Sequence, residues 1–262
     1  MKRIFILGHK GMLGNAVYKF FSARNKYTLL TTEKRWGNEA FNKELSGTDA
    51  EIIINCIGII PQKKPAAELY MSINIELPVF LESFGKKVIH PSTDCEFSGN
   101  IPATRKYTKK DVRDAIDDYG KSKAEISKRI ENGFKNTKII RTSIVGHEEQ
   151  ARLSLLDWFL NSTDGVNGYT NHYWNGITTL EWAKQCENLI NNWDNLPVLN
   201  QYGTEEIRSK YNLLNDIKNI YNKNIDIFPF EALAPINKCL ESDKEITPII
   251  KQLKELRDFY KK

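Results

Sequence analysis

The 262-residue chain is poor in the features that mark several protein classes. Its four cysteines are widely scattered, with no C-x-x-C pair and no histidine at metal-ligand spacing, which argues against a zinc motif or a disulfide framework. Its 15 glycines and 9 prolines are too few for a low-complexity chain. We therefore expect a globular protein with reduced thiols and no metal centre.

Long apolar runs are also missing. No stretch approaches the roughly 18 consecutive apolar residues that a membrane helix requires, and the apolar run at residues 4–7 ends too early for a secretory signal. The formal charge of +5 arises from 38 basic residues dispersed among 33 acidic ones, and not from a basic stripe. These features argue against membrane and nucleic-acid partners. They predict a cytoplasmic protein that binds a small anionic molecule.

Short apolar runs alternate with helical patterns along most of the chain. Strands are predicted at residues 3–7, 27–31, 51–55, 87–90 and 137–141 and near Val198, and helices at residues 12–21, 65–84, 111–132, 180–193, 208–221 and 246–260. Apolar strands with little alternation indicate a parallel sheet covered by helices on both faces. The predicted fold class is α/β, a Rossmann-like doubly wound parallel sheet.

The pattern loosens after about residue 143, which suggests a smaller second unit. At about 150 residues per domain, the length allows one large domain or one domain with a cap. We expect residues 1–142 to form a dinucleotide-binding domain that residues 177–201 rejoin. Residues 143–176 and 202–262 would form a small C-terminal substrate-binding cap.

A glycine-rich segment follows the first predicted strand and opens the first predicted helix. It has the pattern G-x-x-G-x-x-G, from Gly8 to Gly14. Glycines allow a tight turn and a close approach of the backbone to a pyrophosphate, whose charge the helix N-terminus attracts. A strand-to-helix turn can use glycine without a ligand, but three at this spacing favour dinucleotide binding. The predicted contacts are Gly8, Lys10, Gly11, Met12, Leu13 and Gly14.

The end of the second predicted strand bears on the choice of cofactor. NAD-binding units usually place Asp or Glu there, but this strand ends at Thr31 without a carboxylate at its tip. Lys10, Lys34 and Arg35 can instead pair with a 2′-phosphate, and Thr31 is a further expected cofactor contact. We therefore expect NADP(H) in preference to NAD(H), with NAD(H) still open. Glu33 is a contrary feature, and solvated surface cations are the alternative explanation.

Tyr119 and Lys123 lie four residues apart in a predicted helix, so they share one face. A neighbouring ammonium stabilises a phenolate and is expected to lower the tyrosine pKa toward the range useful for acid and base catalysis. Taken alone, such a pair is more often an amphipathic surface feature. The segment Ser92-Thr93-Asp94 strengthens the functional interpretation, because it lies at the carboxyl end of a strand, where open α/β sheets build their sites. Its alternative is a helix cap or a turn.

Together these motifs resemble the extended short-chain dehydrogenase/reductase superfamily, in particular its dTDP-4-dehydrorhamnose reductase group. The resemblance covers most of residues 1–200. It rests on the glycine loop, Asn55-Cys56-Ile57-Gly58, Asn74 with Pro78, Ser92-Thr93-Asp94 through Phe97, Tyr119-Gly120-Lys121-Ser122-Lys123, and Arg141-Thr142. The chain departs from the family at Cys95-Glu96, where Tyr-Val is common, and at Pro61-Gln62-Lys63-Lys64, which replaces a usual acidic segment.

The resemblance implies an oxidoreductase with a catalytic triad of Thr93, Tyr119 and Lys123. Thr93 would orient the keto oxygen, Tyr119 would protonate it, and Lys123 would hold the cofactor ribose. It also implies further cofactor contacts at Asn55, Cys56, Ile57, Gly58, Tyr119 and Lys123. The expected reaction is NADPH-dependent reduction of the 4-keto group of a nucleotide-linked 4-keto-6-deoxy sugar, for surface polysaccharide. A homodimer is compatible with the family.

Thr93, Asp94, Arg152 and Trp174 are the expected substrate contacts. Aromatic rings stack on nucleotide bases, and cationic side chains pair with diphosphates. Candidates for such contacts are Arg152, Tyr173, Trp174 and Lys210, although ordinary packing explains these residues equally well. Two other functions stay open. One is an NAD-dependent sugar-nucleotide epimerase or dehydratase, and the other is a non-catalytic NADP-binding regulatory subunit.

Overall fold

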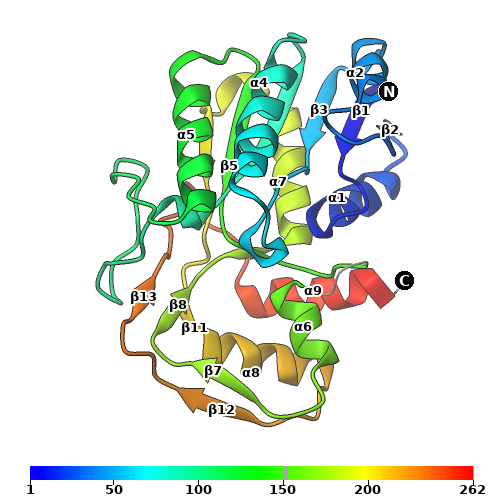
Figure 1. Ribbon diagram of the computed structural model, residues 1–262. Helices are drawn as coiled ribbons and strands as arrows, with labels where there is room; N and C mark the ends of the chain where they lie inside the picture. Colours follow the sequence, from blue (N-terminus) through cyan, green and yellow to red (C-terminus); the bar gives the residue numbers. More distant parts are fainter. Residues whose placement is uncertain (150–152, 262) are drawn as a thin grey trace.

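The computed structural model describes residues 1–149 and 153–261. It has two parts (Figure 1). A six-stranded sheet with helices on both faces forms the upper part in this view. Smaller sheets and helices form the lower part, beyond the carboxyl ends of the strands. This arrangement places the loops that follow the strands between the two parts.

All neighbouring strands of the large sheet are parallel, in the order β10-β5-β4-β3-β1-β2. The strands are β1 (Lys2–Leu7), β2 (Tyr27–Thr31), β3 (Ile52–Asn55), β4 (Lys87–Ser92), β5 (Thr137–Arg141) and β10 (Leu199–Gln201). Because β2 and β3 flank β1 on opposite sides, the chain reverses its winding between β1 and β3. Such a switch point opens a crevice at the carboxyl ends of the strands. The α/β, Rossmann-like prediction is confirmed.

The central strand β1 is apolar from Ile4 to Leu7 because its two faces pack against different cores. Ile4 and Ile6 face the core formed with α1 and α7, whereas Phe5 and Leu7 face the core formed with α2 and α4. The helices of this part are α1 (Met12–Ser22), α2 (Glu39–Ser46), α3 (Ala67–Leu69), α4 (Leu77–Glu82), α5 (Asp118–Gly133) and α7 (Thr179–Asn191). Short 3₁₀ segments occur at Pro61–Lys63, Asp94–Glu96 and Trp193–Asn195.

The lower part, which we call the cap, comprises the described residues of 143–176 and 202–262. Its strands are β6 (Ile144–Val145), β7 (Val166–Tyr169), β8 (His172–Trp174), β11 (Arg208–Ser209), β12 (Ile227–Phe230) and β13 (Ile236–Asn237), and β6 pairs with β9 (Ile177–Thr178). Its helices are α6 (Leu155–Asn161), α8 (Lys210–Tyr221) and α9 (Ile249–Lys261). Treating it as a separate domain is our proposal. None of the described helices has both the length and the apolar character needed to cross a membrane.

Two predicted helices differ from the observed ones. The helix expected at residues 111–132 begins only at Asp118, because Asp111 and Asp117 bond backbone amides with their side chains. Asp111 accepts from the Thr108 amide, and Asp117 caps α5 by accepting from the Gly120 amide. The helix expected at residues 65–84 is divided into α3, a π-helical segment at Tyr70–Glu76, and α4. Pro78 lies in the first turn of α4, where its missing amide hydrogen is not needed.

The close packing of α1 on β1 depends on Gly14. A Cβ atom there would overlap the carbonyl oxygen of Gly8, whereas a Cβ atom at Gly133 in α5 would meet nothing within 4 Å. We expect Gly14→Ala to lower the free energy of unfolding by about 1–3 kcal/mol or more, because backbone atoms must move apart. Gly133→Ala, the matched control, should leave it unchanged or slightly raised. Urea denaturation measures both, and equal stability of the two variants would contradict this account.

Candidate functional site

The glycine loop lies at the switch point between β1 and β3. Gly8 has a φ of +74°, and a Cβ atom there would lie 3.0 Å from the carbonyl oxygen of Cys56. Gly11 donates its amide hydrogen to the Gly8 carbonyl oxygen at 2.9 Å, which closes the turn. The backbone therefore passes tightly from the sheet into α1, in a conformation that a larger residue at Gly8 would strain.

The N-terminus of α1 has unbonded amides that no side chain caps. Gly11 occupies the capping position, and the first turn holds no acidic residue. In contrast, α2, α5, α7 and α8 each have a side chain that accepts from a first-turn amide. Free amides and the positive end of the helix dipole attract an anion. The amides of Met12, Leu13 and Gly14 are thus left without a side-chain cap at the positive end of α1.

Lys10 and Glu33 form an ion pair beside this loop. Lys10 Nζ lies 2.5 Å from Glu33 Oε2, and His9 Nε2 lies 3.5 Å from Glu33 Oε1. The hydrogen bond from Lys10 is the largest cause of the lowered pKa of Glu33. Thr31 ends β2, and Lys34 and Arg35 beyond it are exposed. A carboxylate is therefore present near the strand tip after all, already bonded to the lysine expected to meet a 2′-phosphate.

The residues after β3 line the same crevice. Asn55 is fully buried, accepts from the Ile57 amide at 3.0 Å, and contacts His90 Nδ1 at 3.2 Å. Burial, together with the positive charge of Lys123, lowers the pKa of His90 well below its ordinary value, so this histidine is neutral. The Cys56 thiol has a pKa raised by burial, which keeps it protonated. Gly58 is exposed, and a Cβ atom there would lie 4.0 Å from Lys123 Nζ.

Thr93, Tyr119 and Lys123 come together where β4 ends and α5 begins. Thr93 caps the 3₁₀ segment by accepting from the Cys95 amide at 3.1 Å and donates to Asp94 Oδ1 at 3.0 Å, and its hydroxyl lies near enough to Tyr119 to influence the pKa of that phenol. Lys123 is 4% exposed and donates to the Pro91 carbonyl oxygen at 3.0 Å. Burial lowers the pKa of Lys123 to about 8, although Glu96 opposes the shift. At neutral pH this side chain is still mostly an ammonium.

The expected lowering of the Tyr119 pKa is wrong for this structure. Burial is the largest cause and raises the pKa, and the negative charges of Asp94 and Asp117 add to the rise. The neighbouring Thr93 hydroxyl opposes these effects, and Lys123 is not among the causes. Tyr119 is thus a protonated phenol at neutral pH, which suits the donation of a proton rather than its removal.

Glu96 holds this arrangement together and was not predicted as a site residue. It is fully buried and accepts hydrogen bonds from Ser92 and from Ser127 of α5. Its other oxygen lies 2.7 Å from Arg141 Nη2, which is equally buried, and 2.6 Å from Arg113 Nε. One carboxylate therefore joins β4, α5 and β5. The only signal in the sequence was the departure from the family pattern at this position.

The predicted substrate contacts are only partly placed around the site. Asp94 is adjacent to Thr93 and 8% exposed. Trp174 is 3% exposed, which leaves little of its ring for stacking on a base. Arg152 lies outside the described residues. No group of three or more potential metal-ligating side chains that could hold an ion occurs within the described ranges.

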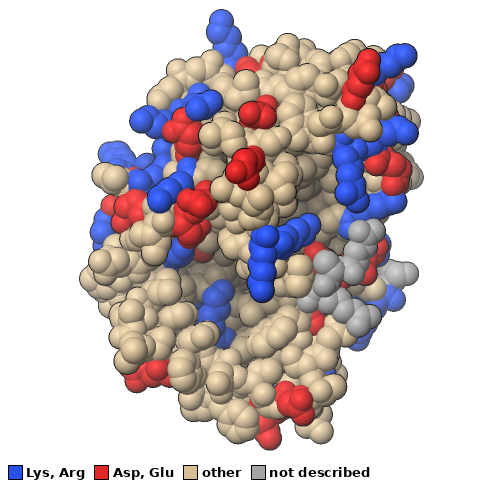
Figure 2. Space-filling view, viewed as in Figure 1, with Lys and Arg blue, Asp and Glu red and all other residues tan. Residues whose placement is uncertain are grey.

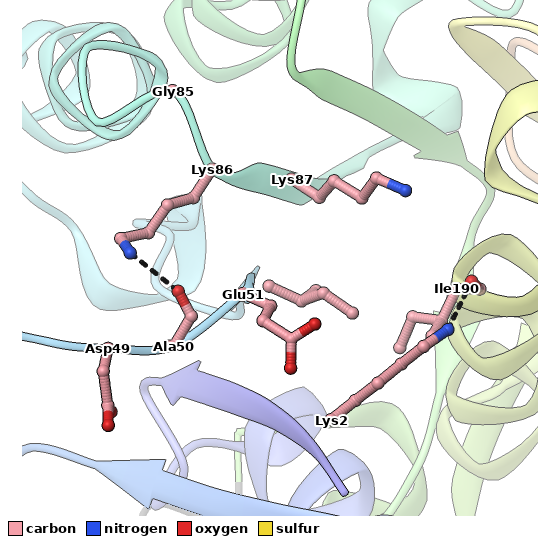
Figure 3. Close-up of a pocket in the computed structure, with 9 residues that line it drawn as sticks. Lys2, Asp49, Ala50, Glu51, Gly85, Lys86, Lys87 and Ile190 are labelled. Atoms are coloured by element: carbon pink, nitrogen blue, oxygen red, sulfur yellow. Dashed lines mark hydrogen bonds between the residues drawn. The ribbon is translucent and has the colours of Figure 1, made fainter.

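The surface is hollowed between the two parts of the molecule, with basic side chains in and around the hollow (Figure 2). A separate pocket of about 400 Å³ lies at the opposite, amino-terminal edge of the sheet (Figure 3). Lys2 and Lys86 on its wall donate to the carbonyl oxygens of Ile190 and Ala50. This pocket contains none of the predicted site residues, so the crevice at the carboxyl ends of the strands is the candidate site.

Residues 1–156, more than half of the chain, match the family described as RmlD substrate binding domain. The chain belongs to this family. A curated relative is the beta subunit of methionine adenosyltransferase 2 from Mus musculus, 24% identical over 160 residues. The match covers 55% of this chain and 47% of the mouse protein, so it spans about half of that relative's length.

Two solved structures are similar to almost the whole chain. A dTDP-4-dehydrorhamnose reductase from Clostridium acetobutylicum is 20% identical, with a TM-score of 0.83 over 99% of this chain and 100% of that one. A dTDP-4-dehydrorhamnose reductase from Bacillus anthracis, solved in complex with NADP, is 17% identical, with a TM-score of 0.81 over 98% and 99% of the two chains. The two likenesses show that this chain shares the fold of both structures.

The buried contacts of Glu96 predict a large contribution of this carboxylate to stability. Glu96→Gln would leave the buried Arg141 guanidinium without its counter-charge, so we expect the free energy of unfolding to fall by about 3–5 kcal/mol. Glu125→Gln removes an exposed i,i+4 pair with Arg129 and should cost far less. Urea denaturation of both variants checks this. A Glu96→Gln protein as stable as the Glu125→Gln control would show that the buried pair is not needed.

Proposed function

We propose that the protein is an NADPH-dependent reductase of the 4-keto group of a nucleotide-linked 4-keto-6-deoxy sugar. The observation that carries this proposal is the meeting of Thr93, Tyr119 and Lys123 beside an uncapped, glycine-lined helix N-terminus. Membership of the RmlD substrate binding domain family and the likeness to two reductases support the substrate class. The reaction would serve the synthesis of deoxysugars for surface polysaccharide.

The crevice fits a dinucleotide at two points. The free amides of the first turn of α1 can bond pyrophosphate oxygens, and the positive φ of Gly8 lets the backbone approach them. Lys123 uses one of its three hydrogens for Pro91, which leaves two for ribose hydroxyls. When bound, the reduced nicotinamide cofactor supplies the hydride for the keto carbon.

The protein's own groups would manage the oxygen of the reacting carbonyl. The Thr93 hydroxyl would turn from Asp94 Oδ1 to hydrogen-bond it, and Tyr119 would donate its proton as negative charge develops there. A phenol with a raised pKa is fully protonated before reaction, so Tyr119 carries the proton that the step requires. The same apparatus could serve an epimerase or dehydratase, but neither of those reactions consumes NADPH overall.

The proposed proton transfer is tested at Tyr119. Tyr119→Phe should lower kcat by about 10²-fold or more, because it removes one proton donor, while NADPH affinity stays nearly unchanged. The measurement is NADPH oxidation with dTDP-, UDP-, GDP- and CDP-linked 4-keto-6-deoxy sugars. Tyr70→Phe is the matched control, since that ring lies 6.3 Å from Tyr119 and has no proposed role. Full activity of Tyr119→Phe would remove the triad assignment.

The Lys10–Glu33 pair gives a test of cofactor preference. If Lys10 meets the 2′-phosphate, Lys10→Ala should weaken NADPH several-fold and leave NADH nearly unchanged, and Arg35→Ala should act in the same direction. Glu33→Gln should favour NADPH, because it frees Lys10 from its present partner. Dissociation constants from cofactor fluorescence check this. Equal losses for both cofactors in Lys10→Ala would refute the NADP assignment.

A second candidate function is a dinucleotide-binding regulatory subunit. The curated relative is named as a beta subunit, and its similarity covers 55% of this chain. Under this proposal the chain would bind NADPH without reducing a sugar nucleotide. The panel above separates the two: turnover with one sugar favours the reductase, and tight NADPH binding without turnover on any of them favours the subunit.

A further inference from the structure

The pocket at the amino-terminal edge of the large sheet is built from the starts of three strands. Lys2 begins β1, Ile52 begins β3 and Lys87 begins β4, and Ile190 adds the last turn of α7. Its volume is about 400 Å³. Small-molecule sites commonly measure roughly 300–1,000 Å³. Because the pocket and the candidate active site lie at opposite ends of the strands, a ligand in one would not displace a ligand from the other.

Three lysines line this pocket, and two of them bond only to backbone oxygens. Lys2 Nζ donates to the Ile190 carbonyl oxygen at 3.4 Å, and Lys86 Nζ donates to the Ala50 carbonyl oxygen at 2.8 Å. Neither ammonium forms an ion pair with a carboxylate of the described residues. A lysine ammonium has three donor hydrogens, so each of these groups keeps two for a ligand.

The third lysine, Lys87, shares an aromatic neighbour with another cation. Lys87 Nζ lies 5.3 Å from the centre of the Trp193 ring, and Lys138 Nζ lies 5.2 Å from the same centre. Burial lowers the pKa of Lys138, and the positive charge of Lys87 adds to this lowering, although Asp194 opposes it. The two ammoniums therefore repel each other. An anion bound beside Lys87 would reduce that repulsion.

Two carboxylates also line the pocket, and they differ in their partners. Asp49 lies 2.8 Å from the Arg3 guanidinium, which neutralises it. Glu51 accepts from the Arg3 amide at 3.1 Å and makes no ion pair within the described ranges. In Figure 3 the Lys2 and Lys87 side chains extend toward α7, and the Glu51 side chain projects into the space beside them. The pocket thus has a cationic end near α7 and a separate carboxylate acceptor.

We propose that this pocket binds a sugar phosphate, a ligand that joins a phosphate monoester to free hydroxyl groups. Lys2 and Lys87 would bind the phosphate oxygens, and Glu51 would accept hydrogen bonds from hydroxyls. The buried side chains of Ile52 and Ile190 give the sugar ring an apolar wall. None of the nine described residues that line the pocket is aromatic, so a nucleobase would find no ring on which to stack.

The test is calorimetric titration with glucose 6-phosphate at low ionic strength, compared with glucose and inorganic phosphate as its two halves. The whole ligand should bind about 10-fold or more tightly than either half, because only it uses both ends of the pocket. Lys87→Met should weaken glucose 6-phosphate about 10-fold, and Lys2→Met should act in the same direction. Glu51→Ala should reduce the preference for glucose 6-phosphate over inorganic phosphate. Lys254→Met, at an exposed lysine of α9, is the matched control and should have no effect.

Trp193 provides a second readout that locates the bound ligand. A phosphate that draws Lys87 from the ring should change the tryptophan emission on titration with glucose 6-phosphate. The change should be absent in Trp193→Phe, whereas the calorimetric affinity should persist in that variant. An emission change that remains in Trp193→Phe would place the ligand elsewhere and overturn the proposal.

Three calorimetric results would also overturn it: no binding of glucose 6-phosphate by the wild-type protein, equal affinities for glucose 6-phosphate and inorganic phosphate, or an unchanged affinity in Lys87→Met. Thermal unfolding of each variant separates loss of binding from loss of fold. The inference does not rest on the proposed reductase, because the pocket shares no residue with the Thr93, Tyr119 and Lys123 site. Its failure would therefore leave that function untouched.

Discussion

The buried carboxylate of Glu96 is the constraint on which the candidate site depends. Thr93 comes from the end of β4, whereas Tyr119 and Lys123 come from α5, so nothing in local chain geometry fixes their separation. Glu96 supplies that restraint by bonding Ser92 on one side and Ser127 on the other. The Arg141 guanidinium completes its charge from β5. A buried ion pair of this kind adds little stability compared with apolar packing, but removal of one partner is strongly destabilising. Its main effect here is therefore to fix the positions of β4, α5 and β5.

Desolvation then sets the protonation states at the site in opposite directions. It raises the pKa of Tyr119 and lowers that of Lys123, so both groups are driven toward neutral forms. The Tyr119 phenol therefore stays protonated at neutral pH. For the lysine it means an ammonium that is less strongly favoured than in water, with a pKa of about 8. The four-residue spacing of Tyr119 and Lys123 predicted that the lysine lowers the tyrosine pKa, but in the folded chain burial raises it and Lys123 is not among the causes.

The parts of the fold that could be predicted are those decided by short stretches of sequence. The strands at residues 27–31 and 137–141 were predicted at their observed bounds, because each contains a brief run of apolar and β-branched residues bounded by polar ones. The start of α5 was misplaced because Asp111 and Asp117 compete for backbone amides, which apolar spacing does not record. The bonds of Glu33 to Lys10 and of Glu96 to Arg141 span 23 and 45 positions. These pairs form only when the sheet folds, so the partners of Glu33 and Glu96 could not be predicted from the sequence.

The positive charge at the sheet side of the crevice has its origin in the backbone. The N-terminus of α1 is positive because no side chain caps its amides and no acidic residue stands in its first turn. An empty crevice leaves the cost of these unbonded amides standing, whereas a phosphate group would relieve it. A site built in this way selects ligands by the placement of negative charge before any contact with a base or a sugar ring.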